Sequence, residues 1–181
     1  KVQLGPALTE GRGAGMLPEV GMQAAIENIE EISKDSSIQV LWQCGTRNYE
    51  GFKALSFPDN VKLLGFVDRM DLAYAAADII VSRAGATSIS ELAIVGKPAV
   101  LVPSPNVAED HQTKNALALV SQGAAILIRD SEGREKLGNE VTALLKDNDA
   151  MEKLSVSIGN LAKPKATSEI VDLIEEVVYG D

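Results

Sequence analysis

The chain has 181 residues, of which 45% are hydrophobic, so it can bury a sizeable core and falls in the size range of one domain. Its 17 basic and 26 acidic residues give a net charge of −9, which argues against general affinity for nucleic acid or an anionic membrane surface. The sequence has no apolar run near the ~18 residues of a membrane span and no signal-peptide pattern. Its only cysteine, Cys44, excludes an internal disulfide framework. We therefore expect one soluble, cytoplasmic domain covering residues 1–181.

Strand-like runs alternate with helical patterns along the chain, which is typical of a parallel sheet with crossover helices. Strands are expected at residues 2–8, 38–43, 61–64, 79–82, 99–102 and 125–128. Helices are expected at residues 17–33, 70–76, 88–95, 109–122, 134–146, 150–161 and 168–178. The predicted fold class is α/β, a Rossmann-like parallel sheet flanked by helices. The C-terminal helix, within residues 165–181, would pack back on the domain or reach toward a partner domain.

The most informative stretch, residues 77–115, contains two strands that are each followed by a helix start. Residues 79–81, Ile-Ile-Val, form an uninterrupted β-branched run, which favours a strand buried on both faces of a parallel sheet. Residues 84–86, Ala-Gly-Ala, make a tight turn, and Thr87 or Ser88 can cap the helix that follows. The first-turn N–H groups of this helix would face the carboxyl end of the strand, where a diphosphate can be held.

The same pattern recurs immediately afterwards. Residues 98–102, Pro-Ala-Val-Leu-Val, predict the next strand, and residues 106–112 open another helix with Asn, Glu, Asp, His and Gln. Both strand-to-helix loops are expected at one edge of the sheet, where open α/β sheets bind ligands. The sequence therefore predicts a ligand site at this edge.

The run SRAGATSISELAIVGKPAVLVPSPNVAEDHQTKNALAL, at residues 82–119, resembles the donor-binding half of the MurG family of glycosyltransferases. VLWQCG at residues 40–45 and GFVDRMDLAYAAAD at residues 65–78 are further landmarks, and the resemblance extends from about Ile38 to the C-terminus. This family transfers N-acetylglucosamine from UDP to a lipid-linked muramyl-pentapeptide in bacterial cell-wall synthesis. The resemblance implies that the chain is one half of a two-domain GT-B glycosyltransferase.

The resemblance also implies which partners and catalytic groups to expect. The donor would be UDP-N-acetylglucosamine, transferred with inversion and without a required metal or other cofactor. In the family, the general base belongs to the other domain, so no catalytic residue is expected here, and this chain alone would bind donor without appreciable turnover. The lipid-linked acceptor would need the N-terminal domain, and the full-length protein would be peripheral on the cytoplasmic face of the inner membrane.

Glu91 has two interpretations. The resemblance places it where the family's glutamate accepts both hydroxyls of the donor ribose, and the two oxygens of a carboxylate suit a vicinal diol. By spacing alone, Ser88-Ile89-Ser90-Glu91 is also a capping box, in which Glu91 would reach back to the N–H of Ser88. With the resemblance added we favour the ribose role, and both roles can hold in turn in the free and bound states.

The diphosphate and the sugar are assigned to the two helix starts. Ala86, Thr87 and Ser88 would offer N–H groups and a hydroxyl to the diphosphate, although ordinary helix capping explains the same residues. Arg83 can offer charge to a phosphate or be a surface residue at the end of the strand.

The resemblance places His111 and Gln112, three residues before the family's asparagine at Asn115, where two polar residues contact the hydroxyls of N-acetylglucosamine. A lone histidine is more often a surface or structural residue, and His111 is not assigned as the general base.

The resemblance further assigns the backbone of Val67 to the uracil base, whereas Phe66 and Met70 are equally explained by core or rim packing. Trp42 and Cys44 are expected in the core, because strand alternation sends one face of VLWQCG inward. The sequence shows no metal-ligand spacing and no Ser/His/Asp set for hydrolysis.

The opening segment, residues 1–35, departs from the family. Glu-Gly-Arg-Gly-Ala-Gly at residues 10–15 stands where the family has Gly-Gly-Ser-x-Gly-Ala, and it matches neither a dinucleotide fingerprint nor a P-loop. A plain flexible loop, or an altered or truncated start, is favoured over a working phosphate loop. Two other functions remain open. One is a UDP-N-acetylglucosamine 2-epimerase, although the acid/base carboxylates of that enzyme are not found here. The other is a non-catalytic or engineered α/β module, in which the polar helix starts serve only as caps.

Overall fold

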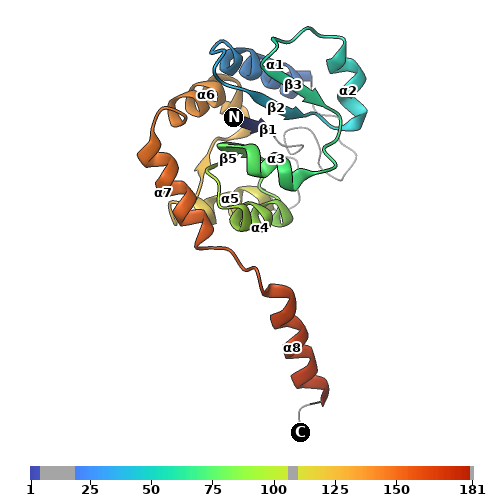
Figure 1. The fold of residues 1–181 in the computed structure, drawn as a ribbon, viewed down its shortest axis with the longest axis vertical. Coiled ribbons are helices and arrows are strands. Elements are labelled where there is room, and N and C mark those ends of the chain that lie inside the picture. Colours follow the sequence, from blue (N-terminus) through green and yellow to red (C-terminus); the bar gives the residue numbers. More distant parts are fainter. Residues whose placement is uncertain (5–18, 106–109, 180–181) are drawn as a thin grey trace.

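The computed structural model describes residues 1–4, 19–105 and 110–179. At its centre is a parallel sheet of six strands in the order β3-β2-β1-β4-β5-β6 (Figure 1). The strands are β1 (Val2–Leu4), β2 (Val40–Gln43), β3 (Val61–Leu64), β4 (Ile79–Ser82), β5 (Ala99–Leu101) and β6 (Ile126–Leu127). The α/β class with a parallel sheet flanked by helices, expected from the alternation of strand and helix patterns, is confirmed.

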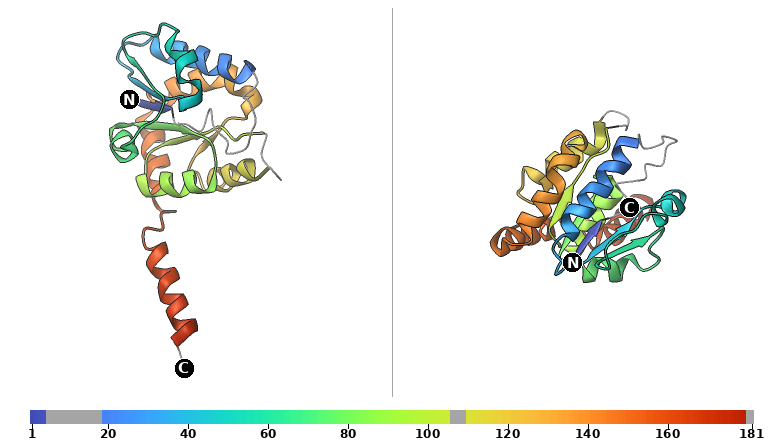
Figure 2. Two further views of the ribbon diagram at one scale, coloured as in Figure 1. Left: turned by 90° about the vertical axis from the view of Figure 1, so that its right-hand side faces the viewer. Right: turned by 90° about the horizontal axis from the view of Figure 1, so that it is seen from above.

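Helices connect the strands and follow the last of them. They are α1 (Glu19–Ser33), α2 (Thr46–Lys53), α3 (Met70–Ala76), α4 (Ala86–Val95), α5 (His111–Val120), α6 (Asp130–Leu144), α7 (Asn148–Gly159) and α8 (Ala166–Tyr179). Figure 2 shows α1 and α6 lying side by side, away from α4 and α5. Each face of the sheet therefore has its own set of covering helices.

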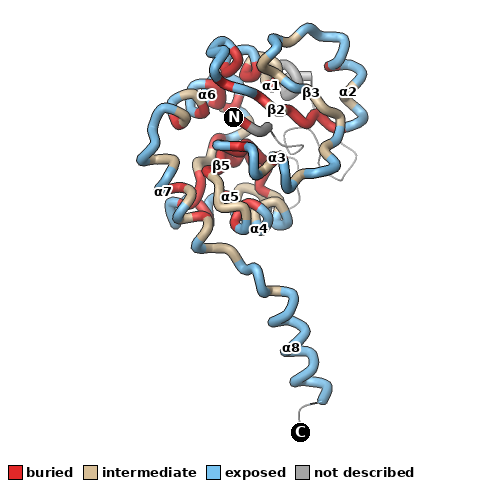
Figure 3. The backbone as a smooth tube through the Cα atoms, in the orientation of Figure 1, coloured by how far each residue is buried: buried red, intermediate tan, exposed pale blue. Residues whose placement is uncertain are grey.

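The β4 strand shows why its sequence is apolar without interruption. Ile79 and Val81 join a core cluster with α1 and α6, whereas Ile80 joins the cluster on the opposite face with α4 and α5. All three side chains are fully buried, and Figure 3 shows the buried residues concentrated on the strands and the inner sides of the helices. The expectation of a strand buried on both faces is confirmed.

The residues of VLWQCG behave as strand alternation predicts. Trp42 and Cys44 are both fully buried in the α1 and α6 side of the core. The Trp42 ring packs against Phe52 of α2, with ring centroids 4.5 Å apart, and edge-on against Phe57 at 5.8 Å. These contacts confirm the assignment of Trp42 and Cys44 to the core rather than to a site.

Two helices differ from expectation. The α2 helix was not expected, because its sequence TRNYEGFK is short and contains a glycine. Its one buried side chain, Phe52, packs against Trp42 of β2. The α6 helix begins at Asp130, four residues before the expected start at residue 134. Its first half is held from α1 by Asn28, whose amide donates to the Gly133 carbonyl at 2.9 Å and accepts from the Gly138 N–H at 2.8 Å.

Other boundaries differ by a few residues. Strands β2, β5 and β6 are shorter than expected, and α5, α7 and α8 begin or end within two residues of the expected positions. The expected strand at 2–8 is observed over Val2–Leu4, and the expected helix at 17–33 over Glu19–Ser33. The remaining parts of these two predictions, and the glycine segment at 10–15, lie outside the described residues.

Helix α8 projects away from the rest of the molecule (Figure 1). None of its described residues is buried, and it carries a group of exposed apolar side chains, namely Ile170, Val171, Leu173, Ile174, Val177 and Val178. Of the two placements expected for the C-terminal helix, packing back on the domain is therefore wrong for this structure. Within the described part of the chain, no helix is both long and apolar enough to cross a membrane.

Candidate functional site

The strand order defines where a ligand would bind. From β1 the chain proceeds outward through β2 and β3, then returns to the other side of β1 for β4, β5 and β6. The topological switch point therefore lies between β1 and β4, and open α/β sheets bind ligands beyond the carboxyl ends of the strands at such a point. The connection after β1 lies outside the described residues, and the connection after β4 consists of residues 83–85.

Helix α4 begins directly at this edge. Its N-cap is Gly85, and the N–H of Ile89 donates to the Gly85 carbonyl at 2.9 Å. The N–H groups of Ala86, Thr87 and Ser88 thus belong to the first turn, where amides have no partner within the helix. The expectation that Thr87 or Ser88 caps the helix is wrong, because the helix begins two residues earlier than expected and its N-cap is Gly85, which makes no side-chain cap hydrogen bond.

The early start of α4 also removes one interpretation of Glu91. A capping box needs the glutamate three residues after the N-cap, and that position is occupied by Ser88. Glu91 is instead an exposed residue further along the helix, and its Oε2 accepts a hydrogen bond from the Tyr74 hydroxyl of α3 at 3.4 Å. Burial, and secondarily the charge of Glu91, raise the pKa of Tyr74 to about 12, so the phenol stays protonated at neutral pH.

Arg83, at the end of β4, contacts two other connections of the sheet. It is only 8% exposed, so it is not a surface residue. Its Nη1 donates to the carbonyls of Val102 at 3.0 Å and Pro103 at 3.1 Å, and it forms an ion pair with Asp130 of α6. The guanidinium therefore holds the loop after β5 and the start of α6 against the turn after β4.

The start of α5 is tied to the same turn. Asp110 precedes the helix with a left-handed backbone, φ 54°, and His111 is the first, exposed residue of the helix. The Gln112 Oε1 accepts the N–H of Ser104 at 2.9 Å. One turn later, the Asn115 amide donates to the Ala84 carbonyl at 3.1 Å. Two adjacent strand-to-helix connections are thus joined side by side, as expected from the parallel sheet.

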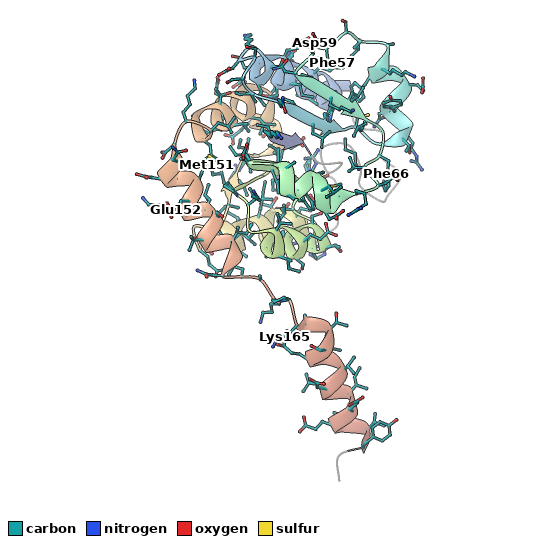
Figure 4. All side chains as sticks on the ribbon, in the orientation of Figure 1. Phe57, Asp59, Phe66, Met151, Glu152 and Lys165 are labelled. Atoms are coloured by element: carbon teal, nitrogen blue, oxygen red, sulfur yellow. The ribbon has the colours of Figure 1, made fainter. Side chains whose placement is uncertain are left out.

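The loop after β3 supplies the remaining expected site residue. Val67 is half-buried, and Phe66 beside it is 63% exposed and lies on the loop that leads to α3 (Figure 4). Of the two explanations for Phe66, burial in the core is therefore wrong. Helix α3, which this loop precedes, reaches α4 through the hydrogen bond between Tyr74 and Glu91.

A cavity elsewhere in the molecule is a second possible ligand site. A cavity of about 320 Å³ lies at the amino ends of β1, β2 and β3 and contains none of the expected site residues. Because ligands of open parallel sheets bind at the carboxyl ends, we place the candidate site at α4 and α5 rather than in this cavity. Among the described residues, no group of three or more His, Cys, Asp or Glu side chains could hold a metal ion.

Sequence reasoning missed three residues that shape the site. Tyr74, Asp130 and Ser104 each bond an expected site residue or its loop. Tyr74 and Asp130 lie 17 and 47 residues away from their partners. Tyr74 belongs to the landmark run at residues 65–78, but nothing in that run indicates a contact with Glu91. Only the arrangement of the helices around the sheet could have revealed them.

A parallel sheet in this strand order, with first-turn helix N–H groups that have no partner within their helix and with polar side chains at its carboxyl edge, defines a Rossmann-like domain suited to binding a nucleotide. Residues 20–175 match the glycosyltransferase family 28 C-terminal domain, and the chain belongs to this family.

Curated relatives carry the name UDP-N-acetylglucosamine--N-acetylmuramyl-(pentapeptide) pyrophosphoryl-undecaprenol N-acetylglucosamine transferase. The protein from Flavobacterium psychrophilum is 52% identical over 142 residues, which cover 78% of this chain and 39% of the relative. The protein from Cytophaga hutchinsonii is 51% identical over 154 residues, which cover 85% of this chain and 41% of the relative. The chain thus spans about two fifths of the length of these relatives.

Solved structures agree with the family assignment. The crystal structure of MurG from Acinetobacter baumannii superposes with a TM-score of 0.75 and 30% identity, covering 97% of this chain and 49% of that one. The spinosyn rhamnosyltransferase SpnG superposes with a TM-score of 0.66 at 17% identity, which shows a shared fold alone. The chain therefore has the architecture of one half of a GT-B glycosyltransferase.

Proposed function

We propose that this chain is the donor-binding half of an enzyme that transfers N-acetylglucosamine from UDP to a lipid-linked muramyl-pentapeptide in peptidoglycan synthesis. The proposal rests mainly on α4. The N–H groups of its first turn lie beside the topological switch point, and Glu91 lies further along the same helix. The names of the curated relatives support this substrate pair, and the family match favours transfer over epimerisation or a non-catalytic module.

The diphosphate is assigned to the first turn of α4. The N–H groups of Ala86, Thr87 and Ser88 can donate to phosphate oxygens, and the positive end of the helix dipole favours an anion there. The chain has a net charge of −9, so this local donor set must outweigh the repulsion of the whole chain. The same groups would stabilise the UDP leaving group as charge develops on it during transfer.

The nucleoside is assigned to Glu91 and Val67. Glu91 is exposed on α4, and its two carboxylate oxygens can accept hydrogen bonds from both ribose hydroxyls. The backbone of Val67, in the loop after β3, would pair with the edge of the uracil base. The contact between α3 and α4 supports this arrangement, because it joins the helix after the base-binding loop to the helix that carries Glu91.

The sugar is assigned to His111 and Gln112 at the start of α5. The Oε1 of Gln112 already accepts the N–H of Ser104, so its NH₂ group is the part of the side chain that would donate to a sugar hydroxyl. His111 is exposed at the first position of the helix and can serve as a second polar contact. We assign neither residue a proton-transfer role.

Transfer itself needs more than this chain. The relatives are more than twice as long as the matched region, and we propose that their remaining part supplies the acceptor site and the general base. The 181-residue chain would then bind UDP-N-acetylglucosamine without appreciable turnover, with no catalytic residue and no cofactor of its own. In the longer enzyme, this domain would work on the cytoplasmic face of the inner membrane, to which the protein is peripherally attached.

Calorimetric titration with UDP-N-acetylglucosamine and with UDP tests the proposal. The parent chain should bind both ligands. Glu91→Gln should lower the affinity for each of them by about tenfold, since a hydrogen bond to a charged group is lost. The control is Glu140→Gln, an exposed glutamate on α6, which should change neither affinity. A folded parent chain that binds neither ligand would contradict the donor-binding function, and full transfer activity in this chain would contradict the need for a further domain.

A further inference from the structure

Tyr74 joins two helices that the proposed function uses for different parts of the donor. It lies on α3, which follows the loop of Val67, and its ring packs against the apolar cluster between the sheet, α4 and α5. Its hydroxyl emerges from this cluster and donates to the Oε2 of Glu91 on α4 at 3.4 Å. An anchored ring thus presents one polar group to one exposed carboxylate.

We propose that Tyr74 is a positioning residue for nucleotide binding, whose hydroxyl holds the Glu91 carboxylate in the orientation that accepts the two ribose hydroxyls. This inference rests on the proposed ribose role of Glu91. Tyr74 would act on the ribose through Glu91, to which its hydroxyl proton is directed. Its effect on binding would pass through Glu91 alone.

The physical reason is preorganisation. Glu91 is exposed, and an exposed glutamate samples several rotamers that it must give up when it binds a ligand. A hydrogen bond from a fixed ring restricts these rotamers before the ligand arrives. A carboxylate has about four acceptor sites, so Oε2 can accept from Tyr74 while sites on both oxygens stay available for a diol. The observed 3.4 Å is long for such a bond, and contacts of this kind often tighten in the complex.

The protonation state of Tyr74 supports this role. Its raised pKa of about 12 keeps the hydroxyl proton in place through the physiological range. The phenol is therefore a hydrogen-bond donor at neutral pH. The alternative is that Tyr74 only packs between α3 and α4, in which case the hydroxyl would be irrelevant to ribose recognition.

Binding of UDP and of 2′-deoxy-UDP to the parent and to Tyr74→Phe separates these possibilities. The substitution keeps the ring and removes the hydroxyl. If Tyr74 positions Glu91, the affinity for UDP should fall by about three- to tenfold in Tyr74→Phe. The affinity for 2′-deoxy-UDP should fall less, so the preference for UDP over 2′-deoxy-UDP should become smaller. Equal loss for both nucleotides, or no loss for either, would overturn the inference. The control Tyr179→Phe removes a hydroxyl from exposed α8 and should leave both affinities unchanged.

Glu91→Ala distinguishes failure of this inference from failure of the proposed function. It should abolish the preference for UDP, and adding Tyr74→Phe to it should have no further effect on that preference, because the hydroxyl acts through Glu91. A preference that survives Glu91→Ala would overturn the ribose role and the positioning role together. A preference lost in Glu91→Ala but intact in Tyr74→Phe would overturn the positioning role alone. A folded parent that binds no UDP would overturn both.

Discussion

Arg83, in the turn after β4, and Asp130, in the first turn of α6, form an ion pair across 47 residues of sequence. The Arg83 side chain is 10% exposed and that of Asp130 is 36% exposed. The same guanidinium donates to the carbonyls of Val102 and Pro103. One buried cation therefore fixes the connections after β4, β5 and β6 relative to one another, and two of these connections carry the proposed donor contacts.

Replacing Asp130 by asparagine should lower the free energy of unfolding by about 1–3 kcal/mol, because it removes the negative charge of the Asp130 carboxylate from beside the buried Arg83 guanidinium. The partial exposure of Asp130 places the effect toward the lower end of this range. Urea denaturation measures the change. The matched control is Asp149→Asn, which also removes an aspartate from a helix's first turn, in α7, but at an exposed position. Equal losses in the two variants would mean that the helix dipole, and not Arg83, accounts for the effect.

Gln112→Glu tests whether the NH₂ group of Gln112 donates a hydrogen bond to the sugar. The new carboxylate can still accept the Ser104 N–H but cannot donate. Affinity for UDP-N-acetylglucosamine should therefore fall by about tenfold more than affinity for UDP, since a donor to the sugar is lost. The added negative charge would weaken the binding of both ligands to the same extent. The ratio of their two dissociation constants, measured by calorimetry, therefore isolates the effect of the lost donor. An unchanged ratio would remove Gln112 from sugar recognition.

The stability of the chain should depend on Tyr74 at high pH. The pKa of this phenol is raised from 10.0 to about 12, by burial first and by Glu91 second. The folded chain thus holds the proton more tightly than the unfolded chain, so this contribution is complete below pH 10 and is lost as pH rises through about 12. The free energy of unfolding should fall more steeply across this window in the parent than in Tyr74→Phe. Identical slopes for the two proteins would contradict the raised pKa.

Much of the fold follows from local sequence patterns. The expected bounds of β3, α3 and β4 agree with the structure, because each is a short periodic or apolar run between clear breaks. The uninterrupted run at residues 79–81 predicts a strand covered on both faces, and the parallel order then brings the starts of α4 and α5 to one edge. The location of the candidate site could therefore be predicted without coordinates.

The contacts that organise the site could not be predicted in the same way. The start of α6 depends on Asn28, which bonds the backbone of two glycines more than 100 residues away. The capping-box pattern at Ser88 and Glu91 was misleading, because α4 begins at Ala86. Arg83 looked like a phosphate ligand or a surface residue, and only the packing of three loops around it shows that it is buried. Spacing along the chain contains no information about such contacts.

The exposed apolar side of α8 should make no contribution to the stability of the rest of the molecule. Since none of the described α8 residues is buried, removing residues 163–181 should change the free energy of unfolding by less than about 0.5 kcal/mol. By contrast, Ile158→Ala in α7, at a fully buried side chain, should cost about 2–5 kcal/mol. Urea denaturation of the two variants and the parent makes the comparison. If truncation were as costly as Ile158→Ala, α8 would have to fold back onto the body in solution, and its apolar residues would be part of the core rather than a surface left exposed.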